Sequence, residues 1–180
     1  MIDKKENEII IQQANSNAVS MMTAVNSSEM KISNNPVETL VAFSIGSGLG
    51  VAVHDPICGV GGMLNFMLPN SSLASGVNPE RVPFMFADTG IPAFLEALYA
   101  FDAQPERLKV VIAGGAHILD QTDAFNIGQK NLAALKTRFD EHNLMIHHEN
   151  TGGSNTRTLS LAIGSGSSSI KIFGKGEETV

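Results

Sequence analysis

The first candidates for a nucleophile in this chain are its one cysteine and two of its serines. Cys58 is the only thiol, and Ser44 and Ser47 lie in a short glycine-rich stretch. A thiol or hydroxyl becomes a nucleophile when a base lies within hydrogen-bond reach, and acyl chemistry also needs donors for the developing oxyanion. The first chemistry to consider is therefore attack on a carbonyl carbon.

Bases that could serve these nucleophiles are far away along the chain. His54 follows Gly48 by six residues in an extended pattern, a span of about 20 Å at 3.3 Å per residue. Cys58 comes later still, in a predicted turn. A serine mechanism whose base is brought in by the fold stays open, and His117 is an isolated candidate for the wall of such a site.

Three histidines invite a metal interpretation, which the spacing does not favour. His147 and His148 are adjacent in a predicted strand, so they point to opposite faces, and His142 stands apart. No cysteine or carboxylate lies at ligand spacing from them. We expect surface histidines, no metal and no cofactor.

Glycines mark two further places where a ligand could approach the main chain. Gly46, Gly48 and Gly50 alternate along one strand face, which indicates either a cleft floor or tight packing under a neighbour. Gly152 and Gly153, with Arg157, could bind an anion through backbone N–H groups, although a structural turn is the favoured interpretation.

Two glycine-rich segments resemble the active-site hairpin of CheD, the bacterial chemoreceptor glutamine deamidase family. Residues 43–48 read F-S-I-G-S-G and residues 61–69 read G-G-M-L-N-F-M-L-P, where the family has L-G-S-C and G-G-M-x-H-x-M-L-P. Further family-like motifs follow in order: G-G-A within 112–116, N-I-G-x-x-N at 126–131, and T-G-G-x-x-x-R at 151–157, with Asn150 in place of an acidic residue. The resemblance covers roughly residues 27–176.

The resemblance implies that three catalytic positions are vacated in this chain. Gly48 stands where the family has its cysteine nucleophile, Asn65 where it has the histidine base, and Ala42 where it has a threonine. We call these the vacated positions and expect no catalytic residue among them. The residues that we expect to line or support the remaining cleft are Ser44, Gly46, Ser47, Gly62, Met63, His117, Gly152, Gly153 and Arg157.

The elements that must position these residues begin with a predicted hairpin. Residues 40–54 alternate between apolar and small side chains, which is typical of a strand with one face on the core, and residues 59–69 read as the return strand. A turn at 55–58 that pairs His54 with Gly59 places Gly48 opposite Asn65. Side chains opposed in this way lie roughly 4.5–5.5 Å apart, close enough for a nucleophile and its base.

Strands and helices alternate in the rest of the chain, which predicts a mixed α/β (α+β) domain. The resemblance implies a mixed-sheet, layered α/β/β/α architecture. We expect residues 1–26 to form a loosely ordered extension and residues 27–180 a single CheD-like domain. The predicted helices are 87–101 and 127–142, the second with Asn126 as N-cap, and the other predicted strands are 29–33, 108–113, 144–148, 157–163 and 168–173.

Composition and charge restrict the classes of partner that this protein could bind. A net charge of −6 and the lack of a Lys/Arg cluster argue against nucleic acid. No apolar run approaches the roughly 20 residues that cross a bilayer, and no signal segment precedes the domain, so we expect a cytoplasmic protein without membrane insertion. A single cysteine, which cannot form an intramolecular disulfide, agrees with that location.

The sequence therefore predicts a CheD-like chemotaxis protein that has lost its deamidase chemistry and acts by binding. The resemblance implies two partners, a methyl-accepting chemoreceptor or a CheC-type phosphatase. Two alternatives stay open: an active hydrolase of protein glutamine side chains with relocated catalytic groups, and a small-molecule sensor that uses the emptied cleft.

Overall fold

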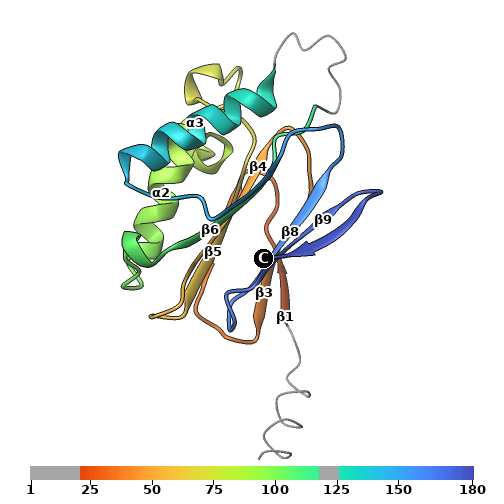
Figure 1. The fold of residues 1–180 in the computed structure, drawn as a ribbon. Coiled ribbons are helices and arrows are strands. Elements are labelled where there is room, and N and C mark those ends of the chain that lie inside the picture. The colour runs from red at the N-terminus through yellow and green to blue at the C-terminus, as the bar shows by residue number, and fades with distance from the viewer. Residues whose placement is uncertain (1–20, 118–125) are drawn as a thin grey trace, which may run out of the picture.

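The computed structural model describes residues 21–117 and 126–180, and these build two five-stranded sheets and two α-helices. Sheet A has the order β1-β3-β8-β9-β10 and sheet B the order β2-β5-β4-β6-β7. The two sheets face each other, and both helices lie on the other side of sheet B (Figure 1). The mixed, layered α/β class expected from the sequence is confirmed.

The first four strands alternate between the two sheets along the chain, β5 to β7 then stay in sheet B, and β8 to β10 lie in sheet A. Their bounds are β1 Met21–Ala24, β2 Glu29–Ser33, β3 Glu38–Ile45, β4 Leu49–Asp55, β5 Val60–Phe66, β6 Lys109–Gly114, β7 His148–Thr151, β8 Arg157–Ala162, β9 Ser168–Ile172 and β10 Gly176–Thr179. The helices are α2 Ala87–Tyr99 and α3 Ile127–Glu141, and short 3-10 turns lie at Ser71–Leu73, Pro79–Arg81, Pro83–Met85 and Pro105–Arg107.

Strand β4 separates the two hydrophobic cores. Its odd-numbered residues Leu49, Val51 and Val53 pack toward the helices, while Ala52 belongs to the core between the sheets. The small even-numbered side chains allow sheet A to approach closely: a Cβ added to Gly50 would lie 2.6 Å from Ile45 Cδ1. Tight packing is thus the explanation for this glycine.

The predicted single strand over 40–54 is wrong, because the chain changes sheets within it. Strand β3 ends at Ile45 in sheet A and β4 begins at Leu49 in sheet B. The β3–β8 register shifts between Ala42 and Ile45, and Ser44 has a φ of 53°, as expected for a bulge that bends a strand. Residues 46–48 form the crossing loop.

The predicted hairpin is present, but its register differs by two residues. Asp55 pairs with Val60, so Asn65 lies opposite Gly50 rather than Gly48. The turn closes in this register because the Asp55 carboxylate accepts the Ile57 N–H at 2.9 Å and the Asp55 carbonyl accepts the Gly59 N–H at 2.9 Å. Periodicity alone does not show this turn chemistry.

The bounds of β7 and of the two helices, and the start of α3, can be compared with the sequence predictions. The predicted strand at 144–148 is wrong, since β7 spans His148–Thr151. Asn126 is the N-cap residue of α3, as predicted, but its φ is 42° and its side chain makes no capping hydrogen bond. Both predicted helices are confirmed to within two residues.

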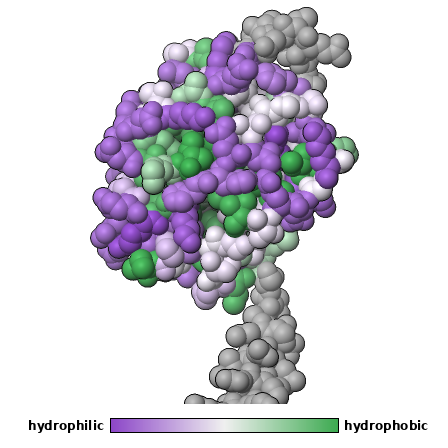
Figure 2. Space-filling model, viewed as in Figure 1, coloured by the Kyte–Doolittle hydropathy of each residue, from purple (hydrophilic) through white to green (hydrophobic). Residues whose placement is uncertain are grey.

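The face of the molecule in Figure 2 is largely hydrophilic, with hydrophobic side chains gathered in separate small areas. Within the described residues, no helix is both long and apolar enough to cross a membrane. Residues 1–20 of the expected extension over 1–26 lie outside the described residues. The last part of this extension contains β1, which pairs in parallel with β3.

Candidate functional site

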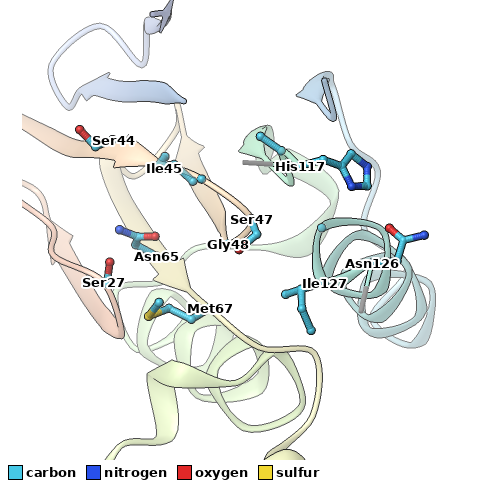
Figure 3. Close-up of a pocket in the computed structure, with 13 residues that line it drawn as sticks. Ser27, Ser44, Ile45, Ser47, Gly48, Asn65, Met67, His117, Asn126 and Ile127 are labelled. Atoms are coloured by element: carbon cyan, nitrogen blue, oxygen red, sulfur yellow. The ribbon is translucent and has the colours of Figure 1, made fainter. Parts of the chain in front are cut away.

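A pocket of about 580 Å³ lies where the chain crosses from sheet A to sheet B. Figure 3 shows Asn65 and Ser27 on one side, His117 and Asn126 on the other, and Ser47 and Gly48 between them. Among the described residues, those that line the pocket are Ser27, Ser44, Ile45, Gly46, Ser47, Gly48, Asn65, Met67, Ala116, His117, Asn126, Ile127 and Gly128. Its volume falls in the usual range for small-ligand sites.

The vacated positions Gly48 and Asn65 meet in this pocket although they are not a cross-strand pair. Asn65 is almost fully buried, and its Nδ2 donates to the Val25 carbonyl at 3.4 Å. A Cβ added at Gly48 would lie 2.6 Å from the main-chain oxygen of Phe66. Ala42 is fully buried in the core between the sheets.

Helix α3 closes one wall of the pocket through very close main-chain contact. A Cβ added at Gly128 would lie 2.3 Å from the Gly115 oxygen, so only glycine lets the first turn of α3 approach the end of β6. One turn later, fully buried Asn131 donates from Nδ2 to the carbonyls of Ser47 and Met67, at 2.8 and 2.9 Å.

The structure brings together part of the expected cleft. Ser44, Gly46, Ser47 and His117 all line the pocket. Gly62 and Met63 are core residues instead: Met63 is fully buried between the sheets, and a Cβ at Gly62 would meet Ile32 and Phe94.

Gly152 and Gly153 form a turn beside the pocket rather than part of its described lining. Gly152 N–H donates to the Gly114 carbonyl at 3.0 Å, and the Gly153 carbonyl accepts the His117 N–H at 2.8 Å. Both glycines have positive φ, 78° and 65°. The turn therefore supports the main chain of His117.

Arg157 is buried and joins the two sheets. Its Nε donates to Asn150 Oδ1 at 2.7 Å, and its terminal nitrogen donates to the Asn155 carbonyl at 3.0 Å. Burial lowers the pKa of the guanidinium, and the nearby Glu178 carboxylate opposes that shift. Glu178 accepts from His148 at 3.1 Å and from Asn150.

Cys58 lies at the far end of β4 from the pocket. It is in the β4–β5 turn and packs against the core under the helices. Seven strand residues separate this turn from the crossing loop, a span of roughly 20 Å.

For chemistry, the described lining of the pocket offers mainly hydrogen-bonding groups. Among its described lining residues none is Asp, Glu, Lys or Arg, and its polar groups are amides, hydroxyls, one imidazole and main-chain groups. Sequence reasoning missed Ser27, Met67 and Asn131. The N-I-G-x-x-N motif contained the signal for Asn131, since a polar residue one turn into an apolar helix face needs a partner.

Fold and site together define an α+β protein of two stacked sheets with a ligand-sized pocket at their junction, whose described lining contains no Asp, Glu, Lys or Arg. The family model for CheD, described as chemotactic sensory transduction, matches residues 67–172. The chain belongs to the CheD family of chemotaxis proteins, as its motifs had indicated.

Named relatives cover most of this chain. The "Probable chemoreceptor glutamine deamidase CheD 1" of Syntrophus aciditrophicus is 43% identical over 150 residues, which are 83% of this chain and 93% of the relative. The corresponding protein of Solibacter usitatus is 36% identical over 84% of this chain and 89% of its own. The chemoreceptor glutamine deamidase CheD of Thermotoga maritima is 31% identical over 88% of this chain and 96% of its own. The family-model match begins at Met67, after all three vacated positions.

Proposed function

We propose that this CheD-family protein lacks cysteine-type deamidase activity and acts by binding a partner at the pocket. Cysteine chemistry needs a thiolate to attack the amide carbonyl and a base to generate that thiolate. Gly48 supplies no side chain, and Asn65 cannot take up a proton near neutral pH.

The observation that carries this proposal is the main-chain contact at Gly48. Because the Phe66 oxygen lies 2.6 Å from where a Cβ would be, a cysteine at this position requires the backbone to move. The glycine at position 48 is therefore required by the local packing, so the difference from the family's cysteine involves the backbone as well as the thiol.

Binding remains possible because the rest of the pocket keeps its shape. Its apolar wall includes Ile45, Met67 and Ile127, and its polar wall offers donors and acceptors without formal charge. Met67 is 42% exposed, which makes it an accessible contact at the pocket.

The proposed partners are a methyl-accepting chemoreceptor or a CheC-type phosphatase. The relatives are named as chemoreceptor glutamine deamidases, which supports a chemoreceptor as the partner. The second follows from the family resemblance alone. Both partners fit the proposed cytoplasmic location.

The direct test is association of the purified protein with a chemoreceptor cytoplasmic fragment and with a CheC-type phosphatase. We expect measurable binding to one of them and an unchanged intact mass of the receptor. Binding to neither, at protein concentrations where an active CheD protein binds, contradicts the proposal.

A matched pair of variants locates the interface. Met67→Glu places a charge at the pocket and is expected to weaken binding at least about tenfold, because the carboxylate must be desolvated on association. Met145→Glu is the control, since Met145 is 75% exposed and lies outside the pocket lining. Equal affinities of the two variants would place the interface elsewhere. Gly48→Trp is a poor probe because it perturbs packing.

An active hydrolase with relocated groups is the second candidate, favoured by one observation. Ser27, Ser44, Ser47 and His117 line the same pocket, so hydroxyls and an imidazole share one solvent space. Incubation with a receptor fragment, followed by mass spectrometry, separates the two functions. Glutamine-to-glutamate conversion that is lost in His117→Gln would establish this candidate.

A small-molecule sensor is the third candidate, favoured by the pocket volume of about 580 Å³. A ligand that binds only the folded state raises its melting temperature. A screen of uncharged compounds by thermal shift, with Met67→Glu as control, tests this function.

A further inference from the structure

Three successive carbonyls of the crossing loop are each held by a different donor. Gly46 O accepts the Ala116 N–H at 2.9 Å, and Gly48 O accepts the Gly115 N–H at 2.8 Å. Between them, Ser47 O accepts Nδ2 of Asn131 at 2.8 Å. Two of these donors come from the end of β6, and the middle one is a side chain from α3.

Asn131 uses its second amide proton on a second segment of the chain. Nδ2 also donates to the Met67 carbonyl at 2.9 Å, so one buried amide joins the crossing loop to the residue that follows β5. The reverse orientation of the amide would place its oxygen against two carbonyl oxygens, so the chemistry fixes this assignment.

The bridging amide of Asn131 also carries an oxygen that lacks a hydrogen-bond donor in the described part of the chain. Oδ1 of Asn131 has no hydrogen-bond partner among the described residues, and the residue is 0% exposed. An apolar side chain of similar size would avoid burying that acceptor. The compensating gain at this position is therefore the pair of bonds from Nδ2.

The held carbonyls determine where the loop N–H groups point. In a trans peptide the C=O and the following N–H are antiparallel, and the described peptide bonds are trans. The N–H of Ser47 therefore points away from Ala116, and that of Gly48 away from Asn131. Neither N–H has an acceptor among the described residues, and both residues line the pocket.

We propose that Asn131 is a positioning residue for the pocket. Its amide fixes residues 46–48 so that the N–H groups of Ser47 and Gly48 remain available to a hydrogen-bond acceptor of the bound partner. It also fixes Met67 relative to that loop. Only the binding part of this inference rests on the proposed function.

The first measurement is hydrogen exchange in Asn131→Ala. Four amides report on the two bridged segments: Gly115 and Ala116, which bind the loop, and Met67 and Leu68, which both bind the Met85 carbonyl. We expect their exchange to accelerate about tenfold or more relative to Ile163, whose N–H binds the Glu38 carbonyl away from the pocket, because two buried carbonyls lose their donor.

Two further variants make this measurement decisive. Asn155→Ala is the matched control, since Asn155 Nδ2 also donates to a backbone carbonyl, that of Phe173, at 3.0 Å. It should leave the four reporter amides unchanged. Asn131→Ser, whose hydroxyl can serve one carbonyl, should give an intermediate effect and replaces the alanine variant if that one does not fold.

The second measurement is binding of the chemoreceptor fragment or the CheC-type phosphatase, whichever binds the unaltered protein. Asn131→Ala should weaken binding about tenfold, and Asn155→Ala should not. Reporter amides that change only in step with Ile163, or undiminished binding by a folded Asn131 variant, would overturn the inference. If the unaltered protein binds neither partner, the proposed function fails while the exchange result still decides the role of Asn131.

Discussion

At the scale of single residues, the main chain leaves no room for a side chain at Gly48 in the present backbone. The Phe66 oxygen lies 2.6 Å from where a Cβ at Gly48 would be, and Asn65 directs its amide to the Val25 carbonyl. Each of these atoms has a packing or hydrogen-bonding role of its own. Positions 48 and 65 are therefore integrated into the fold.

Restoring the three family residues tests this integration. We expect Gly48→Cys alone to lower the free energy of unfolding by about 1–3 kcal/mol, because the new Cβ forces a backbone shift. Adding Ala42→Thr and Asn65→His should give at most weak deamidation of a receptor helix. Urea unfolding and intact-mass analysis check both statements. A stable single variant would show that the Phe66 carbonyl moves easily.

At the scale of elements, the turn between β4 and β5 is held by a buried ion pair. Burial alone would raise the pKa of Asp55, but Arg107 and the N–H groups of Ile57 and Gln104 lower it to about 2. Arg107 approaches the carboxylate at 2.7 Å. Asp55 is therefore ionised in the folded protein at neutral pH.

Acid should weaken this turn in a defined pH range. Because the folded-state pKa of Asp55 lies below its unfolded value, its contribution is complete above about pH 4 and is lost as pH falls toward 2. We expect Asp55→Asn to cost roughly 2 kcal/mol at pH 7 and to flatten the stability profile in that range. Chemical denaturation at a series of pH values measures the difference; parallel profiles for the two proteins would contradict it.

The contact between α3 and the end of β6 is the second element-scale feature to test. Gly128→Ala places a methyl group 2.3 Å from the Gly115 oxygen, so we expect a loss of about 1–3 kcal/mol or more, although alanine is the better helix former. Lys130→Ala, at an exposed position on the same helix, should be nearly neutral. Thermal or urea unfolding distinguishes them, and equal stabilities would show that the helix can shift.

Much of the element pattern could be predicted from the sequence, and the failures have physical causes. Helix α2 and strands β2, β6, β8 and β9 follow from local periodicity. The break at residues 46–48 does not, because alternation continues through a strand that changes sheets. The site was predicted only in part for the same reason: Ser27 and Asn131 reach the pocket through tertiary packing, which has no local pattern.

At the scale of the whole molecule, polar side chains connect the two sheets at several places, and one of them is His54. His54 on β4 of sheet B shares a hydrogen bond of 2.9 Å between its Nε2 and the carbonyl of Ile163, the residue that directly follows β8 of sheet A. Its Nδ1 is buried without a partner among the described residues. Burial lowers the pKa of this imidazole, so the neutral ring with a proton on Nε2 fits the site.

Mild acid should therefore loosen the contact between the sheets. The folded-state pKa of His54 lies below its unfolded value, so its contribution is complete above about pH 6.5 and is lost as pH falls through the folded value. We expect stability to decline from pH 7 to pH 5 and the decline to shrink in His54→Gln. The control is His147→Gln, which should keep the decline of the unaltered protein. An identical decline in all three proteins would assign the effect to other groups.

The close approach of the Phe66 oxygen to Gly48 also bears on how this chain can evolve. We expect a change to cysteine to lower stability at once and, under the proposed function, to yield no activity without a base at position 65 and a threonine at position 42. Each single change toward the three family residues is then unfavourable or neutral for selection, and only the three together bring a benefit. Backbone packing thus favours the retention of glycine at this position in the descendants of this protein.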